Sequence, residues 1–422
     1  MQGISPEKHA ATVHITRRTL IALWGLIAAP WVLVGALAVH HLRWPATSKA
    51  PDNGHGIRAG ANCGVVRGQP GPWGELLYTR IVLEPPDEYV DLRETMPTET
   101  RWLFKGKSQA EAEQFLRDLG VTATQQTGGS WEQTPLGAVL KPSATLVASL
   151  RPEVRARLYG YLAEFEENHP QANPYRFSSD RLEEWLGGAG LRPETLHLVR
   201  HYVYRLGTSL AFADGNIVFP QLRDGEERRR LLKALSRRVA LRVELRVTPQ
   251  SDIPALTTYW SVGGRSKDIA PLLDSLARLP GGGSIDIVHL LPRFARIHLN
   301  TYPNPIMTPG GPPLNCHWSS LNFFRHTPDD SLATTEGAAR TITENYYEIV
   351  GAPRLGDVLL FSTSSGAVIH SCVYVADDVV FTKNGISLST PWVLMRLPDV
   401  AAYYTSAGDP KIRIMRPKER VG

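Results

Sequence analysis

The fold of the C-terminal part turns on one stretch, Pro312-Pro313-Leu314-Asn315-Cys316-His317-Trp318-Ser319-Ser320-Leu321-Asn322-Phe323-Phe324, where a proline-rich loop leads into a helical pattern. Leu321 and Phe324 fall on one face of the predicted helix, and Cys316 stands at its N-terminus. Unpaired backbone N–H groups and the positive end of the helix dipole favour a thiolate there, and they suit an oxyanion as well. Cys316 is therefore the candidate nucleophile.

A strand pattern downstream of the cysteine carries a histidine. Residues 356–361 (GDVLLF) predict one strand after a Gly-Asp turn, and residues 367–375 (AVIHSCVYV) predict a second strand that contains His370. Residues 376–378 (ADD) have the length of a three-residue hairpin loop, and the return strand begins at Val379. His370 is therefore the candidate base for the thiol.

The third catalytic residue depends on the register of this hairpin. If the last residue of the outgoing strand pairs with Val379, His370 stands opposite Asn384, which would hold the imidazole in its working tautomer. We predict Asn384 for this role. A register shifted by one residue would offer Lys383 instead, and Thr382 is also within reach.

These elements resemble the NlpC/P60 family of papain-like cysteine peptidases. Family members carry an Asp-Cys-Ser-Gly type helix start, a Gly-Asp strand, a His-Val-Gly-Ile-Tyr strand and a third polar residue on the following strand. Residues 315–318 (NCHW), 356–361 and 370–374 (HSCVY) stand at the first three places. Asn315 replaces the usual Asp, and bulky His317 and Trp318 replace small residues.

The resemblance implies a papain-like domain, in which a helix bearing the cysteine packs on an antiparallel sheet bearing the histidine. It also implies hydrolysis of amide bonds in cell-wall peptides, often between D-glutamyl and diamino-acid residues, so the expected partner is a peptide or peptidoglycan-like substrate. The residues alone support only thiol-based acyl transfer. Two alternatives stay open: an inactive papain-like module that binds wall peptides or a protein partner, and a thiol acyltransferase.

The other cysteines and the charge exclude several kinds of site. Three cysteines are too few and of the wrong parity for a disulfide framework, and Cys63 and Cys372 are interpreted as small buried hydrophobes, although Cys372 lies near His370 in sequence. No two cysteines stand at a chelating spacing with nearby histidines, and His197 and His201, although four residues apart, lack the acidic partner of the zincin pattern, so we expect neither a metal nor an organic cofactor. The net charge of +5 comes from interspersed acids and bases, so we expect no nucleic acid partner.

An uncharged apolar run occupies residues 20–39 (LIALWGLIAAPWVLVGALAV). A helix of about 20 such residues crosses a bilayer, and Lys8, Arg17 and Arg18 before the run favour a cytoplasmic segment at 1–18. We therefore predict a transmembrane signal anchor at 19–40 and an extracytoplasmic body, in the periplasm or at the cell surface. A cleaved signal peptide stays open as the alternative.

The rest of the chain completes an expected α+β architecture. A linker rich in glycine, proline and asparagine fills 41–74, and 75–283 is predicted to be mostly helical, with strands at 76–83 and 239–247. Within it, Ser108 with Glu111 forms a capping box that begins a helix, and Gly120 ends that helix. The role of this middle region is unknown, and 284–422 is the predicted hydrolase domain.

Overall fold

The computed structural model describes residues 64–91, 99–178, 181–207, 209–222, 224–304, 314–404 and 410–418. The predicted signal anchor at 19–40, most of the predicted linker and Cys63 lie outside these residues. The described chain combines helices with antiparallel sheets, so it is α+β.

The predicted fold class is nevertheless wrong in two respects: the transmembrane helix and the mostly helical middle region. Within the described ranges, no helix has the length and apolar character needed to cross a membrane. The longest, α11 (Gly225–Ser236) and α13 (Ser266–Ala277), have 12 residues each, whereas a membrane span needs about 20. The middle region is not mostly helical either, because strands of three to six residues, too short to show a clear alternation, pair there into sheets.

The middle region contains three antiparallel sheets among its described residues. The sheets have the strand orders β1 (Val66–Arg67), β2 (Glu75–Leu83), β9 (Arg238–Val247), β10 (Gly283–Asp286); β3 (Trp102–Lys105), β5 (Gly137–Pro142), β4 (Gly129–Thr134); and β6 (Tyr175–Ser178), β8 (Ser209–Phe212), β7 (Tyr204–Leu206). β2 and β9 pair along their lengths, from Glu75 opposite Arg246 to Leu83 opposite Arg238. These two are the strands that the alternating sequence pattern predicted.

The helices of this region begin and end largely as their local signals predict. α3 (Gln109–Asp118) has the predicted capping box, in which the Glu111 carboxylate accepts the Ser108 N–H at 2.7 Å. Gly120 follows it with φ of +94°, a left-handed conformation that glycine adopts without strain. The others are α2 (Asp87–Asp91), α4 (Ala123–Gln126), α5 (Ala144–Ser149), α6 (Pro152–Leu162), α7 (His169–Ala172), α8 (Leu182–Gly187), α9 (Pro193–Tyr202), α10 (Gly215–Val218), η1 (Phe219–Gln221), α11, α12 (Ile253–Trp260) and α13.

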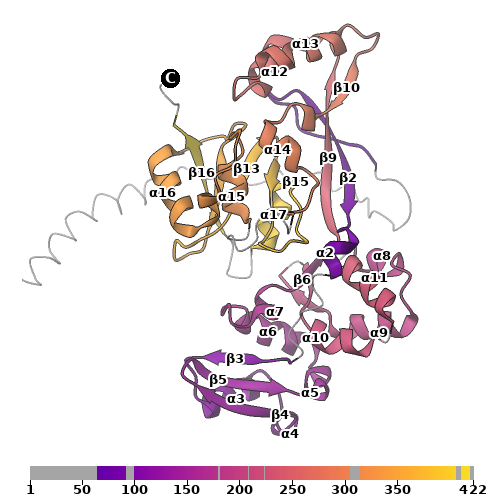
Figure 1. Ribbon diagram of the computed structural model, residues 1–422, viewed down its shortest axis with the longest axis vertical. Helices are drawn as coiled ribbons and strands as arrows, with labels where there is room; N and C mark the ends of the chain where they lie inside the picture. The colour runs from indigo at the N-terminus through magenta and orange to yellow at the C-terminus, as the bar shows by residue number, and fades with distance from the viewer. Residues whose placement is uncertain are drawn as a thin grey trace, which may run out of the picture. The chain divides into compact units, whose positions relative to one another are not determined.

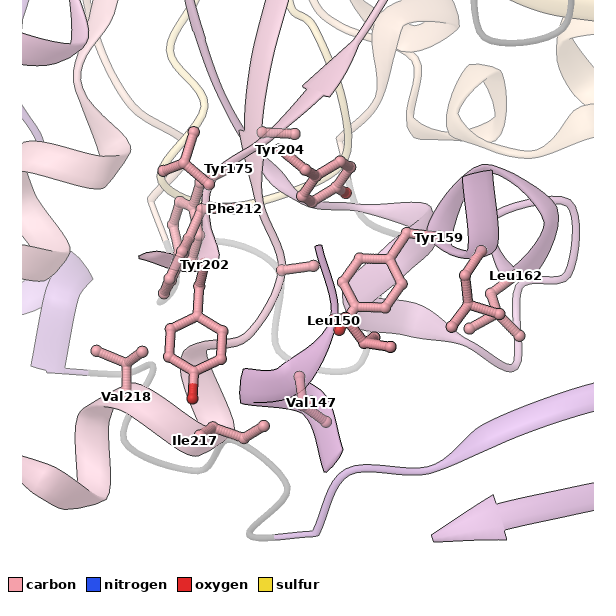
Figure 2. Packing of buried hydrophobic residues seen from close by; sticks show 14 of the residues in the cluster. Val147, Leu150, Tyr159, Leu162, Tyr175, Tyr202, Tyr204, Phe212, Ile217 and Val218 are labelled. Atoms are coloured by element: carbon pink, nitrogen blue, oxygen red, sulfur yellow. The ribbon is translucent and has the colours of Figure 1, made fainter. Parts of the chain in front are cut away.

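A single apolar cluster holds the helices from α3 to α11 and the two smaller sheets together. Figure 2 labels part of it, with aromatic rings from α6, β7 and β8 gathered beside aliphatic side chains of α5 and α10. Tyr159 and Tyr204 meet edge to face, with ring centroids 5.2 Å apart.

The C-terminal region forms one six-stranded antiparallel sheet (Figure 1). Its strand order is β11 (Tyr346–Ile349), β16 (Lys411–Pro417), β12 (Val358–Ser362), β13 (Val368–Ala376), β14 (Val379–Thr382), β15 (Val393–Arg396). The accompanying helices are η2 (Ile287–His289), α14 (Arg293–His298), α15 (Cys316–Leu321), η3 (Asp330–Ala333), α16 (Thr335–Asn345) and α17 (Leu397–Tyr403). The strands at 356–361 and 367–375 are thus present as predicted.

Both faces of this sheet are covered. Val373 and Val375 lie in an apolar cluster with Trp318 of α15, whereas Cys372 and Tyr374 lie in a second cluster on the other face. Successive strand side chains point to opposite faces, so this division follows from the geometry of β13. The first cluster also includes Leu245 of β9, so apolar packing joins the middle region to the C-terminal sheet.

The hairpin that carries the histidine differs from the predicted one by one residue. Its loop is two residues long, because Ala376 pairs with Val379 across a bulge. Beyond the bulge, Val373 pairs with Phe381. β14 ends at Thr382, so the ladder does not extend to a pair between His370 and Asn384.

Candidate functional site

Cys316 is the first residue of α15 and is partly exposed. The helix starts there because Asn315 caps it: its side-chain oxygen accepts the Trp318 N–H at 2.8 Å. The amide nitrogen of Asn315 donates to Ala333 O at 2.7 Å. An aspartate could make the first of these bonds but not the second, because a carboxylate has no N–H to donate.

Hydrogen bonds converge on the Cys316 sulfur. The backbone N–H groups of Ser371 and His317 and the hydroxyl of Ser371 all favour the thiolate, as does the charge of Lys383. Burial of the sulfur outweighs them and raises the pKa of Cys316 above its usual value. The resting thiol is therefore protonated at neutral pH, although its surroundings are arranged to receive a negative charge.

Ser371 connects α15 to β13. Its hydroxyl lies 2.8 Å from His317 Nδ1 and 2.7 Å from Ser320 Oγ. It is the side chain of Ser371, and not that of its neighbour His370, that faces the helix bearing the cysteine. Burial lowers the pKa of His317, so this ring is neutral at physiological pH.

His370 lies on the opposite face of β13 and is fully buried. Its ring stacks on Tyr404 with centroids 4.3 Å apart and meets Phe361 edge to face at 5.3 Å. Burial, with a smaller contribution from the charge of His317, lowers the pKa of His370 to about 3. The imidazole is therefore neutral across the physiological range.

A short chain of hydrogen bonds sets the tautomer of His370. The Thr382 hydroxyl donates to Asn384 Oδ1 at 2.9 Å, so its oxygen is left to accept from His370 Nε2, 3.0 Å away. Nε2 then carries the proton, and Nδ1 keeps a free lone pair. Among the described residues Nδ1 has no hydrogen-bond partner. Thr382 thus contacts the histidine directly, and Asn384, the predicted third residue, acts one hydrogen bond further away.

Lys383 points to the other side of the segment that follows β14 and is fully buried. Its ammonium donates to Gly385 O at 2.7 Å and to Ser387 O at 3.1 Å, and it lies 6.0 Å from the centroid of the Trp392 ring. Burial lowers the pKa of Lys383 to about 7, against the attraction of the Cys316 thiolate.

The predicted site residues therefore fall into two groups. Cys316 contacts Ser371 and interacts electrostatically with Lys383, while His370 contacts Thr382 and, through it, Asn384. Burial raises the pKa values of Cys372 and Tyr404, with a smaller contribution from the charge of Cys316.

Three residues at the site were missed or underrated by sequence reasoning. Ser371 was not considered, although strand alternation next to His370 would have placed it on the helix-facing side. Tyr404 carries no local motif. Lys383 was considered only as an orienting residue for His370, and its burial is visible only in the fold. Cys372 is fully buried, and burial raises its pKa well above the usual value.

Comparison of the chain with protein-family models, with curated protein sequences and with solved structures found no match. The functional argument therefore depends on the geometry of the site and on its chemistry.

Proposed function

We propose that this protein is a cysteine hydrolase that cleaves amide bonds, with Cys316 as the nucleophile. The observation that supports this most is a partly exposed cysteine at a helix start. Burial raises the pKa of its thiol, and hydrogen bonds from the backbone of Ser371 and His317 and from the Ser371 side chain lower it. The same kind of donors would stabilise the oxyanion that forms when the sulfur attacks a carbonyl carbon. A structural cysteine in an apolar core packs as a small hydrophobic side chain and does not need hydrogen-bond donors around its sulfur.

His370 is proposed as the proton carrier. A neutral imidazole with a free Nδ1 lone pair is the form that accepts a proton, and the Thr382 hydroxyl holds it in that tautomer. In the resting structure the Cys316 sulfur is not within hydrogen-bond distance of Nδ1, so the thiol proton would have to reach Nδ1 through a bridging water or after a side-chain movement; it would then pass to the leaving amine, while the acyl group forms a thioester with Cys316. Water would then hydrolyse the thioester and regenerate the thiol.

The substrate class is proposed from the resemblance to NlpC/P60 peptidases. The helix start at Cys316, the Gly-Asp strand and the strand of His370 occur in the family's order, which favours amide bonds of cell-wall peptides as substrates, outside the cytoplasm. His317 and Trp318 differ from the family's small residues. In this protein they serve packing and hydrogen bonding, since His317 contacts Ser371 and Trp318 donates to Asp330 at 3.1 Å.

The test is cleavage of soluble cell-wall peptide fragments by the full chain, followed by mass spectrometry. We expect a new amine and carboxylate end in the product, and loss of at least about 1000-fold in rate in Cys316→Ser. Cys372→Ala is the matched control, because it removes the other free thiol of the described residues, which is fully buried in an apolar cluster; it should keep the activity. Equal cleavage by Cys316→Ser and wild type would refute the proposal.

A second candidate, a peptide-binding module without catalysis, is favoured by one observation: burial keeps the Cys316 thiol protonated at rest. Calorimetric titration with the same fragments separates the two. Binding that is equal in wild type and Cys316→Ser, with no cleavage by either, would support the module.

A further inference from the structure

We propose that a cavity beside α13 binds a small anion that carries an aliphatic chain, with a carboxylate or a phosphate as its charged group. The cavity has a volume of about 490 Å³ and is lined by residues of α13, β10, η2 and α14 and by Arg265 before α13. Pockets that bind small molecules commonly have this size. None of the lining residues belongs to the candidate site around Cys316, so this inference does not depend on the proposed hydrolase.

One part of the cavity wall is apolar. Leu272 and Leu276 of α13 are four residues apart, so they lie on one face of the helix, and Ile285 of β10 joins them. All three side chains are half-buried and pack against the apolar cluster that contains Trp318. Their outer surface is therefore carbon that an aliphatic chain would remove from water.

The other part of the wall is basic. Arg265, His289 and Arg296 line it, and no lining residue carries a carboxylate. The guanidinium of Arg265 is fixed in place, because it donates to Leu291 O at 2.5 Å and to His289 O at 3.2 Å. Its Nε also lies 3.5 Å from Asp268 Oδ2, so its charge is partly compensated. Arg265 therefore serves as a rigid edge of the cavity.

Arg296 of α14 supplies the uncompensated charge. Its side chain is exposed, and it has no hydrogen bond or ion pair with any other part of the chain that the structure describes. The planar fork of a guanidinium matches the two oxygens of a carboxylate or phosphate. The exposed ring of His289 offers a further N–H. The cavity is thus complementary to a molecule with an acidic group at one end and an apolar chain at the other.

The experiment is calorimetric titration of the full chain with octanoate and with octyl phosphate, each as monomers in solution. We expect saturable binding at one site. Octanamide has the same chain without the charge, and acetate has the charge without the chain, so each should bind at least about tenfold more weakly than octanoate. Tighter binding of octanoate would assign the carboxylate as the natural group, and tighter binding of octyl phosphate would assign the phosphate.

Three variants locate the binding. Arg296→Met should weaken it about tenfold, because charged hydrogen bonds to the anion are lost, and Arg296→Glu should abolish it. Arg278→Met is the matched control: it removes an exposed arginine at the end of α13, outside the cavity, and should leave the affinity unchanged. Wild-type affinity in a folded Arg296→Met protein, equal affinity for octanamide and octanoate, or no saturable binding of either anion would overturn the inference.

Discussion

The middle region and the C-terminal sheet each bury a cation completely, and they treat it differently. Arg155 of α6 donates to His201 O at 2.9 Å and to Val147 O at 2.8 Å, and its Nε lies 3.5 Å from Asp214 Oδ2. Lys383 also donates to two carbonyls, but no carboxylate among the described residues forms an ion pair with it.

The partners of Arg155 are fixed by further contacts. Tyr159 donates to Asp214 Oδ1 at 2.6 Å, and the guanidinium lies 5.1 Å from the centroid of the Tyr202 ring. The ion pair and the ring contact hold the guanidinium in a fixed position. Burial lowers the pKa of Lys383 to about 7, so its ammonium can change its charge near neutral pH. We conclude that the first cation is structural and the second is available for chemistry, and four predictions test this contrast.

The largest effect is expected for Asp214→Asn. This change leaves Arg155 buried without its counter-ion, so the free energy of unfolding should fall by about 3–5 kcal/mol. Denaturant unfolding followed by circular dichroism measures it. Peptide cleavage per folded molecule should persist. A loss below about 1 kcal/mol would remove the structural role assigned to Arg155.

Thr382→Val should come next, with a loss of activity of about 10- to 100-fold, because His370 loses the oxygen that sets its tautomer. The free energy of unfolding should fall by less in Thr382→Val than in Asp214→Asn, since valine has nearly the same shape as threonine. Thr382→Ser restores the hydroxyl and should recover most of the rate. The pH–rate profile is the informative measurement: an unchanged profile with unchanged rate in Thr382→Val would exclude the relay from Thr382 to Asn384.

The pH dependence of stability sharpens the comparison further. His370 has a folded pKa of about 3 and an unfolded value near 6.5, so below pH 6.5 the unfolded chain binds a proton that the folded chain does not. Stability should therefore fall as the pH drops from 6.5 towards 3, with a slope from this residue of at most about 1.4 kcal/mol per pH unit.

Substitution of the histidine isolates this contribution. In His370→Gln the slope should decrease by that amount. Asp214 acts in the opposite sense, because burial raises its pKa to about 6 against the hydrogen bond from Tyr159 and the charge of Arg155. Its contribution falls as the pH rises from about 4 to 6, and it is common to both proteins. Parallel curves of unfolding free energy against pH for the wild type and His370→Gln would show that His370 is protonated in the folded state over the same pH range as in the unfolded chain.

The smallest effect on stability is expected for Lys383→Met. Removing a buried charge that lacks a counter-ion offsets the loss of donors to Gly385 O and Ser387 O, so the free energy of unfolding should change by less than about 2 kcal/mol at pH 7. Thermal and denaturant unfolding at matched pH test it. A cost as large as that of Asp214→Asn would show that both cations are structural.

Local patterns in the sequence determined much of the site. The helix start at Cys316 and the strands around His370 follow from turn signals, apolar runs and helix-start chemistry within a few residues of each side chain. The capping box at Ser108 is of the same kind. Such signals involve only a few neighbouring residues, so they can be recognised in the sequence without knowledge of the fold.

Only the tertiary structure decided which face of β13 meets α15. The strand is apolar and buried on both faces, so no alternation marks the side that receives the helix, and Ser371 rather than His370 faces it. The burial of Lys383 was equally hidden, since a lysine in sequence predicts exposure. Both outcomes depend on segments far apart in the chain, α15, β13 and the end of β14, whose packing no single segment encodes.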